Sequence, residues 1–267
     1  MKTVDAHVHL WRLDDGRHGW IIPAMEQLHR DFDRSELVQH MDRADVRCAL
    51  LVESSDHQAE NEALAAEAAT SGRIGGFIGN AQVAATALGE PHFDRTAGAL
   101  GVRLSARSRS LTWFAEQDRA DVLAMLERRC LVLDLLLDWT QLATVRMVAR
   151  RHPSLSIVLN HCATPPAELS HYEREIRLTA ELPNIACKLS GLGGPASHRT
   201  WRRQVTLIVL QAFGDDRVIW GSDWPIVECF GGYQAWLNEA RLHVTEAGFD
   251  GDHVFGGTAR HIYGLAA

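Results

Sequence analysis

Short apolar segments alternate with longer amphipathic segments along most of the chain. The apolar segments are nearly continuous runs of hydrophobic residues, which is typical of parallel strands that are covered on both faces. Eight of them are expected to form strands, at residues 4–9, 48–53, 74–79, 100–104, 131–137, 156–161, 185–190 and 217–223.

The amphipathic segments between these runs predict helices, because their apolar residues recur at helical spacing. Two stretches are harder to interpret. Residues 81–96 are interrupted by Gly89 and Pro91, and residues 12–30 form an irregular segment after the first strand. Helices are expected at residues 35–45, 58–70, 118–129, 140–152, 172–182, 201–213, 233–247 and 252–263.

Repeated strand–helix units predict an α/β fold, and eight of them predict a (β/α)₈ TIM barrel. A length of 267 residues suits such a barrel as a single domain over residues 1–267. The alternative is an open, doubly wound sheet. It is disfavoured because no Gly-x-Gly-x-x-Gly motif follows the first predicted strand.

Composition narrows the functional class. The chain is 46% hydrophobic and 23% charged, with a formal net charge of −7, as in an ordinary globular protein. No long run of Lys and Arg indicates nucleic-acid binding, and no apolar stretch is long enough for a membrane span. The five cysteines form no Cys-x-x-Cys pair and no signal-peptide pattern is present. We therefore expect a cytoplasmic protein that binds a small molecule, and a homo-oligomer remains open.

Polar residues stand at the carboxyl end of each predicted strand. In a barrel these ends meet at one mouth, where barrel enzymes keep their catalytic groups. Burying such side chains without partners would be costly. The residues are His7, His9, Glu53, Asn80, Arg103, Asp134, Asp138, His161, Lys188, Ser190 and Asp223.

His7 and His9 are two residues apart, so in a strand both imidazoles point to the same face. Together with His161 and Asp223 they form a set that suits one divalent ion, most naturally Zn²⁺ with a position left for water. Asp223 is expected to bind the metal, to accept the proton of the water, or to do both. His161 is expected either to bind the metal or to contact the carbonyl group of the substrate.

Two cations and two tryptophans are candidates for substrate binding. Arg103 and Lys188 lie within apolar strands, so each needs an anionic or hydroxyl-rich partner. That partner is either the substrate or a neighbouring carboxylate such as Asp134. Trp11 and Trp20 flank the predicted mouth and could form a platform for a sugar ring, or they could pack along its rim.

Several short motifs carry a resemblance to a known family. They read DAHVHLW at 5–11, GVR at 101–103, LVLD at 131–134, NH at 160–161, CKLSG at 187–191 and GSDWP at 221–225. In order and spacing they resemble the amidohydrolase superfamily of the amidohydrolase-2 type. More closely, they are similar to its lactonase branch, which includes sugar-acid lactonases and 2-pyrone-4,6-dicarboxylate lactonase.

The resemblance implies a (β/α)₈ barrel and hydrolysis at a mouth built from His7, His9, His161 and Asp223. It also implies one divalent metal ion that could be dispensable, because members of this branch differ in their need for metal. A binuclear centre is not expected, since Arg103 stands where binuclear relatives carry a bridging lysine.

The first functional hypothesis is therefore a lactonase that opens the lactone of a sugar acid of the fucono-, rhamnono- or galactonolactone type. In this hypothesis Asp223 is the general base that activates water. The alternative is a metal-dependent, non-oxidative decarboxylase of an unsaturated or aromatic acid. A barrel that only binds a ligand is disfavoured, because the His pair and Asp223 are both present.

Overall fold

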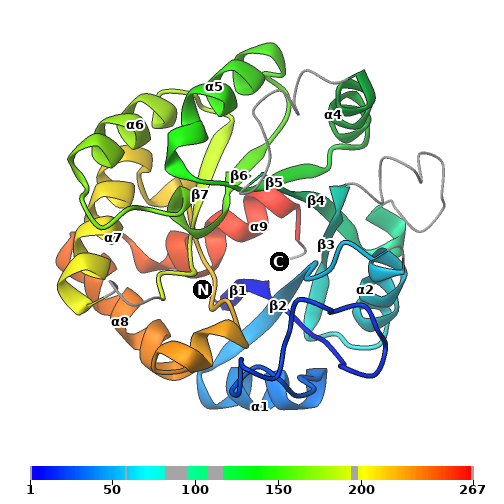
Figure 1. Cartoon of the computed structure of the whole chain (residues 1–267). Helices are drawn as coiled ribbons and strands as arrows, with labels where there is room; N and C mark the ends of the chain where they lie inside the picture. Colours follow the sequence, from blue (N-terminus) through cyan, green and yellow to red (C-terminus); the bar gives the residue numbers. More distant parts are fainter. Residues whose placement is uncertain (1, 58, 82–94, 107–116, 194–197, 266–267) are drawn as a thin grey trace.

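The computed structural model describes residues 2–57, 59–81, 95–106, 117–193 and 198–265. Its strands form a central ring, and helices surround the ring on the outside (Figure 1). The strands are β1 (Thr3–Val8), β2 (Val46–Val52), β3 (Ile74–Asn80), β4 (Ala99–Ser105), β5 (Val132–Leu136), β6 (Ile157–Leu159), β7 (Ile185–Leu189) and β8 (Val218–Trp220).

Helices and short helical turns connect the strands. The helices are α1 (Arg34–Arg43), α2 (Glu60–Ala69), α4 (Gln117–Arg129), α5 (Leu142–Arg151), α6 (Ser170–Ala180), α7 (Arg199–Phe213), α8 (Tyr233–Glu246) and α9 (Thr258–Tyr263). The short turns are η1 (Arg95–Ala97), η3 (Trp139–Gln141), η4 (Asn160–Ala163), η5 (Asp215–Arg217), η6 (Ile226–Phe230) and η7 (His253–Gly257). Most of residues 81–96, the stretch that the sequence leaves open, lies outside the described residues.

The sheet runs from β1 to β8 in sequence order, and each strand pairs in parallel with the next. Its two ends meet at a seam just beyond β1 and β8. There the amide of His9 donates to the carbonyl oxygen of Trp224 at 2.8 Å, and the amide of Asp223 donates to that of His7 at 2.9 Å. These bonds join the first strand to the last, so the predicted (β/α)₈ barrel is confirmed and the open sheet is wrong.

The helices form where the sequence gives them one apolar face. In α5, for example, Leu142, Val145, Val148 and Ala149 are buried at helical spacing, and the helix ends just before Pro153. Asp33 caps the start of α1, because its carboxylate accepts the amide of Glu36 at 3.0 Å. No helix in the described ranges is both long and apolar enough to cross a membrane.

A second apolar cluster fills the inside of the barrel, separate from the core between strands and helices. It includes Val4, Leu50, Val158 and other inward side chains of the strands. Ala259 and Tyr263 of α9 belong to this cluster, and α9 lies across the ring of strands in Figure 1. The helix therefore covers the amino end of the barrel and leaves the carboxyl end for the loops.

Two predicted strands are too long at their carboxyl ends. The segments predicted at 156–161 and 217–223 are strands only over Ile157–Leu159 and Val218–Trp220. The chain turns away because His161 and Asp223 have φ angles of 52° and 62°, in the left-handed region that a strand cannot contain. Both residues thus project from turns at the mouth.

Candidate metal and hydrolytic site

Three histidines surround one carboxylate oxygen at the carboxyl end of the barrel. The Oδ1 atom of Asp223 lies 3.4 Å from Nε2 of His9, 3.7 Å from Nε2 of His7 and 3.9 Å from Nε2 of His161. All four side chains are buried. The structure therefore brings together the four residues that the sequence assigns to the centre of the site.

The backbone around this centre is shaped for close approach. The left-handed conformations of His161 and Asp223 cost about 1–3 kcal/mol each in a non-glycine residue, and such strain is common at functional sites. Gly191 leaves room for an imidazole, because a Cβ atom there would lie 2.1 Å from Nδ1 of His161. A side chain at position 191 would displace His161 from the site.

Hydrogen bonds to the Nδ1 atoms orient two of the imidazoles. Nδ1 of His9 lies 2.8 Å from the carbonyl oxygen of Val52, so Nδ1 carries the proton and Nε2 presents its lone pair to the site. Nδ1 of His161 lies 3.0 Å from the hydroxyl oxygen of Ser190. These partners fix the rings while leaving the Nε2 atoms directed at Asp223.

The surroundings of the His7 imidazole indicate whether the centre suits a metal ion. Its imidazole is fully buried, and neither ring nitrogen has a hydrogen-bond partner among the described residues. Burial, and then the charge of Lys188, hold the pKa of His7 well below its usual value. A buried, neutral imidazole without partners is costly unless it binds a cation.

The ligand atoms are close enough to share one ion. Atoms of His7, His9 and Asp223 all lie within 4.8 Å of one another. Within the described part of the chain, no other group of three or more His, Cys, Asp or Glu residues meets this criterion. Imidazole nitrogen and carboxylate oxygen are ligands that zinc and similar ions accept. The residues present therefore fit a divalent metal.

Asp223 is held in its charged form. Burial alone would raise its pKa, but His161, the hydrogen bond with His9 and the charge of Arg103 outweigh burial, so the pKa of Asp223 falls below its ordinary value. A carboxylate in this state can bind a metal ion and can accept a hydrogen bond from water.

Asp5 supports the site through the backbone and is not among the residues expected at the site from the sequence. Its Oδ1 accepts the amides of Ser222 at 2.8 Å and of His7 at 3.2 Å, so it ties together the two segments that carry candidate metal ligands. Burial raises the pKa of Asp5 to about 6. Strand alternation could not have identified it, because the register of β1 against β2 shifts between Asp5 and Val8 and breaks the two-residue period there.

A recess of about 440 Å³ opens at the same end of the barrel. Arg103 and Glu53 form part of its wall, and Trp20 lies at its edge with 42% of its surface exposed. The indole nitrogen of Trp20 donates to the carbonyl oxygen of Ser54 at 2.7 Å, which fixes the ring in place. Arg103 and Trp20 therefore both line this recess.

The structure does not bring the other two candidate substrate contacts, Trp11 and Lys188, to this recess. Trp11 is only 1% exposed, packs edge-on against Phe32 and donates its indole nitrogen to the carbonyl oxygen of Arg30. Lys188 has no exposed surface, and its Nζ lies 2.5 Å from Oδ2 of Asp134. Trp11 therefore packs along the rim, and Lys188 forms a buried ion pair with Asp134.

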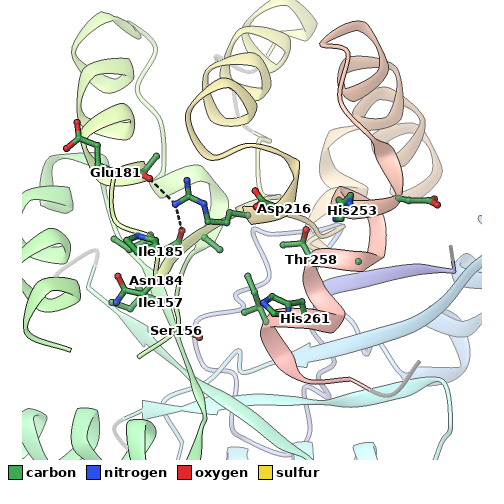
Figure 2. Close-up of a pocket in the computed structure, with 16 residues that line it drawn as sticks. Ser156, Ile157, Glu181, Asn184, Ile185, Asp216, His253, Thr258 and His261 are labelled. Atoms are coloured by element: carbon green, nitrogen blue, oxygen red, sulfur yellow. Dashed lines mark hydrogen bonds between the residues drawn. The ribbon is translucent and has the colours of Figure 1, made fainter. Parts of the chain in front are cut away.

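A larger cavity of about 1000 Å³ lies at the opposite end of the barrel (Figure 2). It lies between the first residues of β6 and β7, including Ile157 and Ile185, and the C-terminal segment with Thr258 and His261. None of the four central residues lines it. In TIM barrels the amino end of the strands contributes stability rather than catalysis.

Comparison with known proteins identifies relatives along the whole chain. L-fucono-1,5-lactonase of Burkholderia ambifaria is 30% identical over 278 aligned positions, covering 97% of this chain and 94% of that protein. L-fucono-1,5-lactonase of Burkholderia multivorans is 28% identical over 98% of this chain and 96% of its own.

Solved structures agree with this relationship. A crystal structure of an amidohydrolase from Burkholderia multivorans with bound zinc superposes with a TM-score of 0.90, at 26% identity and with both chains fully covered. The 5-carboxyvanillate decarboxylase of Sphingomonas paucimobilis superposes with a TM-score of 0.69 at 14% identity over 99% of each chain, which shows a shared fold only.

The family model for amidohydrolases matches residues 4–265, from the first strand to the last helix. The matched region contains all four residues of the central site, and both L-fucono-1,5-lactonases match nearly the whole chain. The chain belongs to the amidohydrolase family.

Proposed function

We propose that the protein is a lactonase that hydrolyses the lactone of a sugar acid. The observation that carries this proposal is the convergence of the Nε2 atoms of His7, His9 and His161 on Oδ1 of Asp223 at the mouth of the barrel. Two full-length relatives named L-fucono-1,5-lactonase support the choice of a lactone as substrate.

In the proposed reaction Asp223 is the general base. Its carboxylate takes a proton from water as the water oxygen forms a bond with the lactone carbonyl carbon. The ring C–O bond then breaks, and Asp223 returns the proton to the leaving alkoxide oxygen. Water and lactone thus give one hydroxy acid. The low pKa of Asp223 keeps the carboxylate ionised and ready for the first step.

His161 is placed to stabilise the negative charge that develops on the carbonyl oxygen. Its ring is fixed by Ser190, so a donor can be held in position before the reaction begins. Fixed donors of this kind contribute about 3–4 kcal/mol to transition-state stabilisation in comparable sites. Nε2 of His161 lies 3.9 Å from Oδ1 of Asp223, so His161 is also placed to serve as a further metal ligand.

His7, His9 and Asp223 are the residues that would hold one divalent ion, which we propose to be zinc. Zinc in the structure of the Burkholderia multivorans relative supports that identity. When bound, such an ion supplies Lewis acidity and lowers the pKa of water. The protein's own contribution is the fixed Nε2 atom of His9 and the ring of His7, which has no hydrogen-bond partner among the described residues.

The recess lined by Arg103, whose charge acts on both His7 and Asp223, is the proposed substrate site. Trp20 offers a flat apolar face of the kind that packs against sugar rings, and Arg103 offers hydrogen-bond donors to ring oxygens or hydroxyl groups. We further propose that the enzyme works in the cytoplasm, because all five cysteines are free, as expected in a reducing compartment.

The competing hypothesis is decarboxylation, and the two reactions differ in their products. Purified protein with zinc supplied is incubated with sugar-acid lactones and, separately, with unsaturated and aromatic acids. Lactonase activity releases acid from a neutral ring ester and produces no carbon dioxide. If the protein released carbon dioxide from an acid substrate and released no acid from any lactone, the result would contradict the lactonase proposal and favour decarboxylation.

Replacing Ser190 with alanine is expected to lower kcat for lactone hydrolysis by about ten-fold or more. The substitution removes the partner of Nδ1 of His161 at 3.0 Å and lets the ring rotate. Ser35→Ala is the matched control, because Ser35 binds only Asp33 at the start of α1. Unchanged kcat in Ser190→Ala would mean that Ser190 does not position His161.

A further inference from the structure

Glu53 and Arg103 form a close ion pair in the wall of the recess. Nε of Arg103 donates to Oε1 of Glu53 at 2.7 Å, and Nη2 donates to the carbonyl oxygen of the same residue at 2.6 Å. The two residues are only 3% and 8% exposed. The positive charge of Arg103 is therefore matched within the protein before a ligand arrives.

The other described cation in the recess wall is matched in the same way. Arg17 binds Asp15 through Nε and Nη2, at 3.0 and 2.6 Å, and donates through Nη1 to Glu60. Asp56 adds a further carboxylate to the wall. Among the described residues that form the recess or pair with its cations, the acids Asp15, Glu53, Asp56 and Glu60 therefore outnumber Arg17 and Arg103.

We propose that Glu53 is a specificity-determining residue that excludes lactones carrying a carboxylate group and favours neutral, polyhydroxylated lactones. This inference rests on the proposed lactonase function. A substrate carboxylate would have to displace Glu53 from Arg103 or lie beside it, and in a partly buried recess the repulsion between like charges is strong. A neutral hydroxyl group meets no such penalty.

The recess keeps hydrogen-bonding capacity for such hydroxyl groups. Nη1 of Arg103 takes no part in the bonds to Glu53, so it can donate to an uncharged oxygen. Carboxylate oxygens of Glu53 and Asp56 can accept from hydroxyl groups. Hydroxyl donors thus match the carboxylates of the wall, Glu53 and Asp56, whereas a carboxylate on the substrate does not.

The test uses two lactones that differ in one group. Galactono-1,4-lactone is neutral, and galactaro-1,4-lactone carries a carboxylate in place of the C6 hydroxymethyl group. The wild-type enzyme is expected to prefer the neutral lactone in kcat/KM by about 100-fold or more. Glu53→Gln keeps an oxygen that can accept from Arg103 and removes the charge, so the preference is expected to fall by about ten-fold or more. The change is expected mainly in KM for galactaro-1,4-lactone.

Two controls separate charge from structure. Glu53→Asp keeps the charge and is expected to keep the preference. Glu175 lies on the outside of the barrel, where its Oε2 is 2.8 Å from Nη1 of Arg146 in an ion pair between α6 and α5. Glu175→Gln removes this carboxylate and should leave the preference unchanged. An unchanged preference in folded Glu53→Gln would overturn the inference.

A measurement on the wild-type enzyme covers the case in which Glu53→Gln fails to fold. Converting the C6 carboxylate of galactaro-1,4-lactone to an uncharged amide removes the repulsion without changing the protein, so kcat/KM should be about ten-fold or more higher for this amide than for galactaro-1,4-lactone. An amide that is hydrolysed no faster than the carboxylate, or a wild-type enzyme that hydrolyses both original lactones equally well, contradicts the role of Glu53. Failure to hydrolyse any lactone would instead contradict the proposed function itself.

Discussion

Replacing Asp223 with asparagine is expected to reduce kcat for lactone hydrolysis by about three to four orders of magnitude. Asparagine has nearly the same size and shape, but its amide cannot take a proton from water or return it to the leaving group. The backbone bond from residue 223 to the carbonyl oxygen of His7 does not depend on the side chain, so the seam of the barrel should persist. Steady-state kinetics measures the loss, and circular dichroism checks the fold.

Asp216→Asn is the matched control for this experiment. Asp216 is exposed and lines the cavity at the opposite end of the barrel, far from the three histidines. This variant is expected to have normal kcat. Activity within a few-fold of wild type in Asp223→Asn would contradict the assignment of Asp223 as the base.

Replacing Lys188 with methionine is expected to lower the free energy of unfolding by about 3–5 kcal/mol. Lys188 and Asp134 are both fully buried and paired at 2.5 Å. Asp134 also accepts hydrogen bonds from Asn160 at 3.0 Å and from Tyr263 at 2.7 Å. Without Lys188 these neutral donors would face a buried carboxylate whose charge is no longer matched.

A double variant distinguishes the cost of an unmatched charge from the cost of lost packing. Lys188→Met with Asp134→Leu removes both charges and should recover a large part of the lost stability in urea unfolding. Arg177→Met is the surface control, because its pair with Glu173 is exposed and worth at most about 1 kcal/mol. A loss below about 1 kcal/mol in Lys188→Met would show that the buried pair is not needed.

The barrel could be predicted because each strand is buried on both faces and so appears as a continuous apolar run. The grouping of the four candidate site residues could be predicted because His7 and His9 are two residues apart, and because His161 and Asp223 follow the apolar runs of two other strands. The backbone at those last two residues could not be predicted. Left-handed φ angles in such residues persist only where the surrounding tertiary structure holds them, which no local pattern encodes.

Which carboxylate pairs with each buried cation could not be predicted from the sequence either. Arg103 and Asp134 lie opposite each other in the register of β4 and β5, yet Asp134 pairs with Lys188, and Arg103 pairs with Glu53. These choices depend on how side chains cross the interior of the closed barrel. Trp11 and Trp20 illustrate the same limit, because the fold of the loop after β1 buries one and exposes the other.

Hydrolysis of L-fucono-1,5-lactone by the purified protein is the decisive test of the proposed lactonase function. Purified protein with one equivalent of zinc is mixed with the lactone, and formation of the hydroxy acid is followed by NMR above the uncatalysed rate. We expect a kcat/KM of about 10⁴ M⁻¹s⁻¹ or higher for this lactone or a close stereoisomer. The proposed function would be contradicted if folded, zinc-loaded protein formed no acid above the uncatalysed rate from L-fucono-1,5-lactone or any of its stereoisomers.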